Sequence, residues 1–197
     1  MRWFRYHNTN CFFIESTGGR YLAFDAGWPC TLYEYKRMLK TIDIKYEDIS
    51  LVVISHMHMD HAGLLTDFQK SMIECCVTKE QLFEIDAMER IILRNREYEK
   101  YERINKNSLT VLGIEEINEL LMNNKIMGQI IETKGHSEDS ISFVTYNYEV
   151  LIGDLALQNQ IMEDALKSME SWKMIRGMNV KSVYPSHAER FLIEENG

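Results

Sequence analysis

Residues 55–61 constrain this chain more than any other segment. They read Ser-His-Met-His-Met-Asp-His, so three histidines and one carboxylate stand close together in the sequence. The segment directly follows the apolar run 51–54, whose length and β-branched side chains predict a buried strand. Residues 62–65 have the character of a helix start. Because open α/β folds place ligands at the C-terminal ends of strands, the pattern predicts a functional loop at such an end.

Histidine and aspartate side chains supply the nitrogen and oxygen donors that zinc and similar divalent ions accept. A single histidine on a core strand is usually satisfied by one ordinary hydrogen bond. Four ionisable side chains packed this tightly would each need a separate partner if they were buried. We therefore predict that residues 55–61 bind metal.

The segment His56-x-His58-x-Asp60-His61 resembles the signature of the metallo-β-lactamase superfamily of metal-dependent hydrolases. Later parts of the family pattern follow in the same order along the chain. They are Gly135-His136-Ser137, Gly153-Asp154 and Pro185-Ser186-His187, and Phe24-Asp25-Ala26-Gly27 resembles the structural Asp-x-Gly turn that precedes them. The resemblance extends from about Cys11 to His187 and therefore covers most of the sequence.

The resemblance implies one domain over residues 1–197 with the four-layer αβ/βα sandwich of this superfamily. It also implies a helical insertion at about residues 79–106 that could act as a lid over the metals. Sequence patterns alone support an α/β fold with much hairpin pairing. Strands are expected at 11–14, 21–24, 51–54, 72–77, 129–133, 141–146, 149–152 and 180–184, and helices at 31–42, 64–70, 81–93, 113–121 and 158–178.

The resemblance also implies a set of metal ligands. His56, His58 and His136 would bind one metal, Asp60, His61 and His187 the second, and Asp154 both, with Asp25 supporting the metal loop by hydrogen bonds. Two zinc ions are the implied cofactors, although iron or manganese occupies such sites in some relatives. His58 favours zinc, since relatives with a redox di-iron centre usually carry glutamate there. Ser55, Ala62-Gly63 and Ser186 depart from the common pattern, but none of these departures removes a ligand.

The implied activity is hydrolysis of an ester, thioester, lactone or related bond of a small molecule. Two metals would share a hydroxide, which Asp60 would help to orient. A phosphodiesterase or nuclease of the same fold is an alternative, and a non-catalytic metal-binding domain is another. Lactonase and β-lactamase activities stay open at this point. A glutathione thioesterase is less favoured, because little sequence follows His187.

Composition bears on partners and on compartment. The net charge of −8 disfavours a large nucleic-acid footprint, which needs clustered Lys and Arg. No apolar run approaches the length of a membrane span, and the N-terminus lacks a signal-peptide pattern. The four cysteines lack Cys-x-x-Cys spacing and are interpreted as free thiols. We expect a cytoplasmic protein with a small-molecule substrate and neither nucleic-acid nor membrane partners.

Residues 94–103 continue the helical pattern of 81–93 but are strongly charged. The plain interpretation is a solvated helix with ion pairs along it. The alternative is a lid over the metals, in which Arg94, Arg96, Tyr98 and Tyr101 would contact substrate. Tyr184 could donate a hydrogen bond to an oxyanion, although a packing role is the more common one for such a tyrosine.

Overall fold

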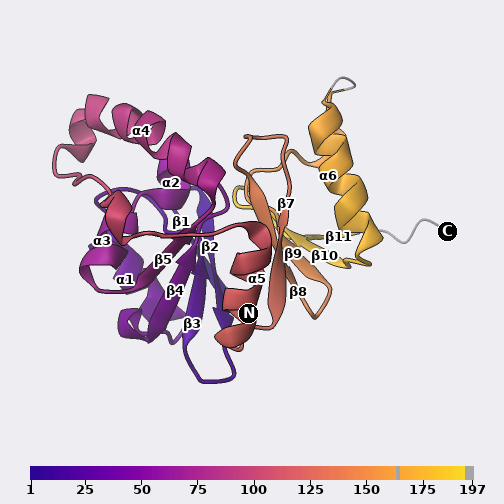
Figure 1. Ribbon diagram of the computed structural model, residues 1–197, viewed down its shortest axis with the longest axis horizontal. Coiled ribbons are helices and arrows are strands. Elements are labelled where there is room, and N and C mark those ends of the chain that lie inside the picture. Colours follow the sequence, from indigo (N-terminus) through magenta and orange to yellow (C-terminus); the bar gives the residue numbers. More distant parts are fainter. Residues whose placement is uncertain (163–164, 194–197) are drawn as a thin grey trace.

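The computed structural model describes residues 1–162 and 165–193, and two β-sheets lie side by side at its centre (Figure 1). The first sheet has the strand order β1-β2-β3-β4-β5-β6 and the second β11-β10-β9-β8-β7. The strands of the first sheet are β1 Arg2–Tyr6, β2 Thr9–Glu15, β3 Tyr21–Phe24, β4 Ile49–Val53, β5 Glu74–Val77 and β6 Thr110–Val111. Those of the second are β7 Gly128–Glu132, β8 Ile141–Thr145, β9 Glu149–Leu151, β10 Ser182–Tyr184 and β11 Phe191–Leu192.

Helices cover the outer faces of both sheets (Figure 1). The α-helices are α1 Leu32–Thr41, α2 Met59–Ala62, α3 Leu65–Lys70, α4 Lys79–Arg94, α5 Ile114–Asn123 and α6 Leu166–Gly177. Helix α5 is the exception to this arrangement, because its Ile117 and Leu121 join the apolar cluster formed by the inner faces of the two sheets. Single-turn 3-10 helices are η1 Tyr46–Asp48, η2 Arg96–Tyr98, η3 Lys106–Ser108 and η4 Gln158–Gln160. Helix α6 lies against the second sheet, while α1, α3 and α4 lie on the side of the first sheet.

Three apolar clusters separate these layers, and alternation along the strands sorts the side chains among them. In β2, Cys11 and Phe13 face the cluster beneath α1, α3 and α4, whereas Phe12 and Ile14 face the cluster between the two sheets. A third cluster lies between the second sheet and α6, around Trp172. The order helices, sheet, sheet, helix confirms the predicted α/β four-layer sandwich.

Most of the predicted elements are present, with three kinds of exception. The hairpin of β2 and β3 and the hairpin of β8 and β9 both form as predicted. The predicted helix continuing to residue 103 is wrong, because α4 ends at Arg94 and the side chain of Asn95 accepts a hydrogen bond from the Glu97 amide. The helix predicted from 158 begins only at Leu166. Strands β1, β6 and β11 were not predicted.

The apolar side chains of α6 are divided between its buried and exposed faces. Trp172 and Ile175 are buried against the second sheet. Leu166 and Met169 are exposed instead, and Ser168 and Ser171 take the buried positions near the helix start. The Ser171 hydroxyl donates a hydrogen bond to the Lys134 carbonyl oxygen, so this end of α6 contacts the polar loop before His136.

None of the described helices is long and apolar enough to cross a membrane. The four cysteines are free thiols, and Cys11, Cys75 and Cys76 are buried while Cys30 is exposed. Cys75 and Cys76 point to opposite faces of β5, as expected for neighbours on a strand.

Candidate metal centre

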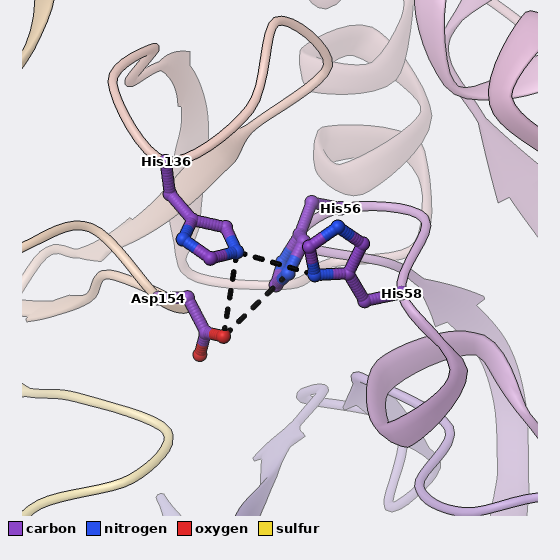
Figure 2. Close-up of side chains that lie close together, drawn as sticks. All are labelled: His56, His58, His136 and Asp154. Atoms are coloured by element: carbon purple, nitrogen blue, oxygen red, sulfur yellow. Dashed lines mark hydrogen bonds and ion pairs between the residues drawn. The ribbon is translucent and has the colours of Figure 1, made fainter. Parts of the chain in front are cut away.

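Segments that follow four strands deliver the predicted ligands to one place. His56 and His58 follow β4, His136 follows β7, Asp154 follows β9 and His187 follows β10. Figure 2 shows that His56, His58, His136 and Asp154 point toward one another, and one atom from each lies within 4.8 Å of those of the others.

A second group lies beside the first. Asp60 and His61 belong to α2, and His187 meets them from the other sheet. One donor atom from each of the three lies within 4.8 Å of the other two. The Nε2 atoms of His61 and His187 lie 3.3 and 3.1 Å from Asp60 Oδ2. The sequence-predicted ligands therefore divide into two groups, as the resemblance implied.

Asp154 faces both groups with different oxygens. Its Oδ2 lies 3.7 Å from His56 Nε2 and 3.6 Å from His136 Nε2. Its Oδ1 lies 3.3 Å from His61 Nε2 and 3.1 Å from His187 Nε2. A carboxylate that presents one oxygen to each of two donor groups has the geometry needed to bridge two metals.

Buried polar atoms without hydrogen bonds show that this donor set fits metal ions. His56 Nε2, His61 Nε2 and Asp154 Oδ1 are buried and have no hydrogen-bond partner among the described residues. Burying such atoms without a partner costs free energy. All three point into the cluster, where a divalent ion would satisfy them. The nitrogen and carboxylate donors suit zinc and also iron or manganese.

The two carboxylates stay ionised in this cluster. Burial opposes ionisation of Asp60, but the close imidazoles of His187 and His61, 3.1 and 3.3 Å from its Oδ2, outweigh it and hold the pKa of Asp60 well below its usual range. The same contacts act on Asp154, whose pKa is also well below its usual range. The carboxylates of Asp154 and Asp60, each 3.1 Å from His187 Nε2, raise the pKa of His187 to about 10. Both carboxylates therefore face the cluster as anions, the state in which a carboxylate binds a metal ion.

Asp25 and Ser55 fix the orientation of two histidine rings. Asp25 is fully buried and accepts a 2.7 Å hydrogen bond from the Ser55 amide and a 2.9 Å bond from His61 Nδ1. The Ser55 hydroxyl donates to Asp25 and lies 3.0 Å from His56 Nδ1. Because Nδ1 of each ring is engaged here, Nε2 of each faces the cluster. This is the supporting contact expected of Asp25.

Gly153 lets the Asp154 loop approach Ser55 closely. Its φ of +56° lies in the left-handed region, and a Cβ there would lie 2.9 Å from Ser55 Cβ and Oγ. Any other residue would meet both a backbone penalty and a steric clash. The Gly-Asp pair in the sequence thus reflects a close approach between the two halves of the site.

Asn8 and Thr9, at the turn of the hairpin that β1 and β2 form, support the second ligand group. This role was not predicted from the sequence. Thr9 on β2 donates a 3.1 Å hydrogen bond to Asp60 Oδ2, and the indole of Trp28 donates a 3.1 Å bond to the Thr9 hydroxyl. His187 Nδ1 donates to the Asn8 carbonyl oxygen at 2.8 Å. His187 Nε2 is thereby directed at Asp60 and Asp154.

A second missed pair joins α4 to both metal loops. The Gln81 side chain donates to the carbonyl oxygens of Ile54 (2.7 Å) and Asp139 (3.3 Å), and the Asp139 carboxylate accepts from the Met57 amide at 2.7 Å. Gln81 is fully buried and Asp139 is nearly so. The capping-box pattern Thr78-x-x-Gln81 was a signal for a polar role of Gln81, since its Oε1 also accepts from the Thr78 amide.

The five predicted substrate contacts lie away from the hollows next to the cluster. Tyr98 and Tyr101 are buried in the cluster beneath α4, and the Tyr101 hydroxyl is 3.4 Å from Glu89 Oε1. Tyr184 packs between the sheets and donates to Glu149. Arg94 and Arg96 are exposed. None of the five lines either of the two described hollows that His136 borders, so their contact with substrate stays a prediction.

Comparison with known proteins agrees with this geometry. The family model described as the metallo-beta-lactamase superfamily matches residues 5–72, which include the His56–His61 motif. The structure also superposes along most of its length on solved structures that include a protein described as a metallo-beta-lactamase family protein. The chain has the metallo-β-lactamase fold. The resemblance seen in the sequence is thereby confirmed.

Three solved structures show how widely this fold is shared. TTHA1623 in a di-iron-bound form aligns with a TM-score of 0.69 at 18% identity, covering 98% of this chain and 94% of that one. The metallo-beta-lactamase family protein TTHA1429 from Thermus thermophilus gives 0.67 at 15% identity, covering 93% and 70%. FIM-1 from Pseudomonas aeruginosa, in a mono-zinc form, gives 0.63 at 16%, covering 93% and 78%. The metallo-β-lactamase fold of this chain thus occurs in proteins described with iron and with zinc.

Proposed function

We propose that this metallo-β-lactamase-fold chain is a binuclear metal-dependent hydrolase that cleaves an ester, thioester, lactone or related bond of a small molecule. The observation that carries the proposal is Asp154, whose two oxygens face the two donor groups separately. Two zinc ions suit the histidine-rich donor set, and iron or manganese would fit the same atoms.

In the proposed centre, His56, His58 and His136 hold one ion, Asp60, His61 and His187 hold the other, and Asp154 contacts both. When bound, a pair of divalent ions lowers the pKa of a water from 15.7 to about 7 and polarises a carbonyl oxygen. The reaction adds water across the scissile bond, so the carbonyl carbon gains oxygen and the leaving oxygen or sulfur gains a proton.

The protein residues orient these groups. Asp60 is 14% exposed, and its Oδ2 lies where His61, His187 and Thr9 converge. It can hold the attacking water by a hydrogen bond as well as bind metal. The half of the site formed by His56 and His61 is buried, whereas His136 and His187 are about one third exposed, at 31% and 35%. Substrate would therefore enter from the side of His136 and His187.

A hydrolase screen with and without a chelator tests the proposal. The panel contains aryl esters, thioesters, lactones, β-lactams and bis-nitrophenyl phosphate, each assayed with zinc-reconstituted protein and with the Asp60→Asn variant. We expect chelator-sensitive hydrolysis of at least one ester, thioester or lactone, and its loss in the variant. Hydrolysis of the phosphodiester alone would favour the nuclease alternative. No hydrolysis of any substrate would favour a non-catalytic metal-binding protein.

Elemental analysis tests the binuclear part separately. Protein purified without chelator and then reconstituted with zinc should contain two metal ions per chain. A stoichiometry that stays at or below one would contradict a binuclear centre, even if the protein is an active hydrolase.

A further inference from the structure

A hollow of about 250 Å³ opens directly beside the two ligand groups. His136, Asp154 and His187 form one side of it, so an occupant would touch residues of both groups. The rest of its lining is largely apolar and includes Leu155, Ala156, Leu157, Pro185, Ala188 and the amide of Gln160. The segment after β9 and the segment after β10 thus provide most of its wall.

Hydrogen bonds and packing fix that wall in place. Leu155 is 3% exposed and belongs to the cluster beneath α6. The Trp172 indole donates a 2.8 Å hydrogen bond to the Ala156 carbonyl oxygen, which ties the wall to α6. The Ser186 amide donates to the Gly153 carbonyl oxygen at 3.0 Å and joins the two wall segments. A hollow held in this way is preformed, so an occupant pays little to order it.

Apart from the ligand residues and the metal ions that they would hold, the lining offers no cation for an anionic group. Among the described residues that border this hollow, none is Lys or Arg. A neighbouring hollow on the other side of His136 is bordered by Lys167, but the Lys167 ammonium pairs with Glu138. A carboxylate or phosphate at the end of a substrate chain that lies along the apolar wall would lose its hydration with no side-chain cation to compensate it. The net charge of −8 adds to this disadvantage.

We propose that this hollow receives an uncharged aliphatic acyl chain, so that the substrates are neutral esters, thioesters or lactones. This inference rests on the proposed function and names the substrate class for it. At about 30 Å³ for each water-sized group, 250 Å³ accommodates roughly eight non-hydrogen atoms. The carbonyl group lies at the metal ligands, and the chain extends along Leu155, Ala156 and Leu157. Gln160 is the polar side chain available to contact a ring oxygen or a hydroxyl on the chain.

A series of p-nitrophenyl esters tests the chain-length dependence. Each additional buried methylene contributes about 0.8 kcal/mol, which corresponds to about a fourfold rise in kcat/KM. We expect kcat/KM to rise from acetate to butyrate to hexanoate and to level off or fall beyond octanoate. The mono-adipate ester has the chain of the hexanoate ester but ends in a carboxylate. It should be hydrolysed about 100-fold less efficiently than the hexanoate ester.

Substitution of one wall residue tests whether the dependence of kcat/KM on chain length arises from this hollow. Leu157 is partly exposed, so Leu157→Arg adds a cation to the hollow without opening the core. This variant should lose efficiency on hexanoate at least tenfold and gain efficiency on adipate. The matched control Leu192→Arg changes an exposed leucine on β11 and should leave both values within twofold. Equal behaviour of the two variants would overturn the assignment of the hollow.

Alkyl hydroxamic acids provide a readout that does not need turnover. Their head group, which binds metals, is the same in every member of the series. Differences in inhibition constant or thermal shift of zinc-reconstituted protein therefore report the contribution of the alkyl chain. Affinity should increase from aceto- to hexanohydroxamic acid and lose this dependence in Leu157→Arg. If no ester is hydrolysed but this dependence holds, the proposed activity fails and the hollow assignment stands. If esters are hydrolysed with no dependence on chain length, or adipate is preferred, the hollow assignment fails.

Discussion

From the hydrogen bond between Thr9 and Asp60 we predict how a substitution at Thr9 changes the affinity for the second metal. Thr9 is fully buried, and its hydroxyl lies 3.1 Å both from the Trp28 indole nitrogen and from Asp60 Oδ2. An indole N–H only donates, so the Thr9 oxygen accepts from Trp28. Its own proton is then available for Asp60, with Asn8 Oδ1 farther away at 3.4 Å. Trp28 thereby directs the Thr9 proton toward the ligand.

The expected magnitude follows from this geometry. A hydrogen bond to a charged group contributes about 1.5–3 kcal/mol, and supporting partners of metal ligands typically change metal affinity by about 10- to 100-fold. Thr9→Val keeps the shape of the side chain and removes the hydroxyl. We expect the metal held by Asp60, His61 and His187 to bind about 10- to 100-fold more weakly. The metal held by the other group should be affected less than threefold.

Zinc titration of metal-free protein, in competition with a chromophoric chelator, measures both affinities. Thr9→Ser keeps the hydroxyl and should stay within threefold of the unchanged protein at both sites. Trp28→Phe removes the indole donor and should give a smaller loss at the second site. The reasoning is refuted if Thr9→Val binds both metals as the unchanged protein does, or loses both equally. Thermal unfolding of the metal-free variants shows whether folding is intact.

Three further predictions concern other parts of the molecule. Asp154→Ala should lower metal content from two ions to below one, whereas His58→Ala should lose mainly the first ion; full metal content and hydrolysis in Asp154→Ala would disprove bridging. Glu89→Ala removes a buried carboxylate that accepts from the Ile104 amide at 2.7 Å, and about 3 kcal/mol lost should lower Tm by about 6–12 °C with metal content unchanged; a fall below 2 °C would contradict this. Burial raises the pKa of Cys75 to about 12, so at pH 8 a thiol reagent should titrate only Cys30 in native protein, and a second fast thiol would show that the described core opens.

The predicted ligands could be found from sequence because each follows a strand and stands in a recognisable motif. Two glycines mark the backbone of these motifs, and Gly153 is a glycine because Ser55 leaves no room for a Cβ. The grouping of the ligands required the resemblance, since His187 and Asp60 are far apart along the chain. Spacing alone would not have paired them.

The supporting residues could not be found in the same way. Thr9 stands in a strand where a threonine is ordinary, and its role depends on an indole that arrives from another loop. The capping box marks Gln81 as a polar position, but the bonds of Gln81 and Asp139 to backbone groups of distant segments leave no mark on the sequence. The two helix boundaries that were predicted wrongly, the end of α4 and the start of α6, share a cause. Helical periodicity continued past Asn95 and began before Leu166, where capping and packing against the second sheet decided the boundaries instead.

The hydrogen bond between His187 Nδ1 and the Asn8 carbonyl oxygen joins residues 179 positions apart. Asn10 strengthens this junction by donating to the Pro185 carbonyl oxygen at 2.8 Å. During synthesis the first hairpin leaves the ribosome long before His187 exists, so the second donor group cannot assemble on a partial chain. The metal proposed for this group would therefore bind only after both halves of the chain have been made. The two halves of the chain are already joined by the protein's own hydrogen bonds, so a metal at this group would strengthen an existing junction.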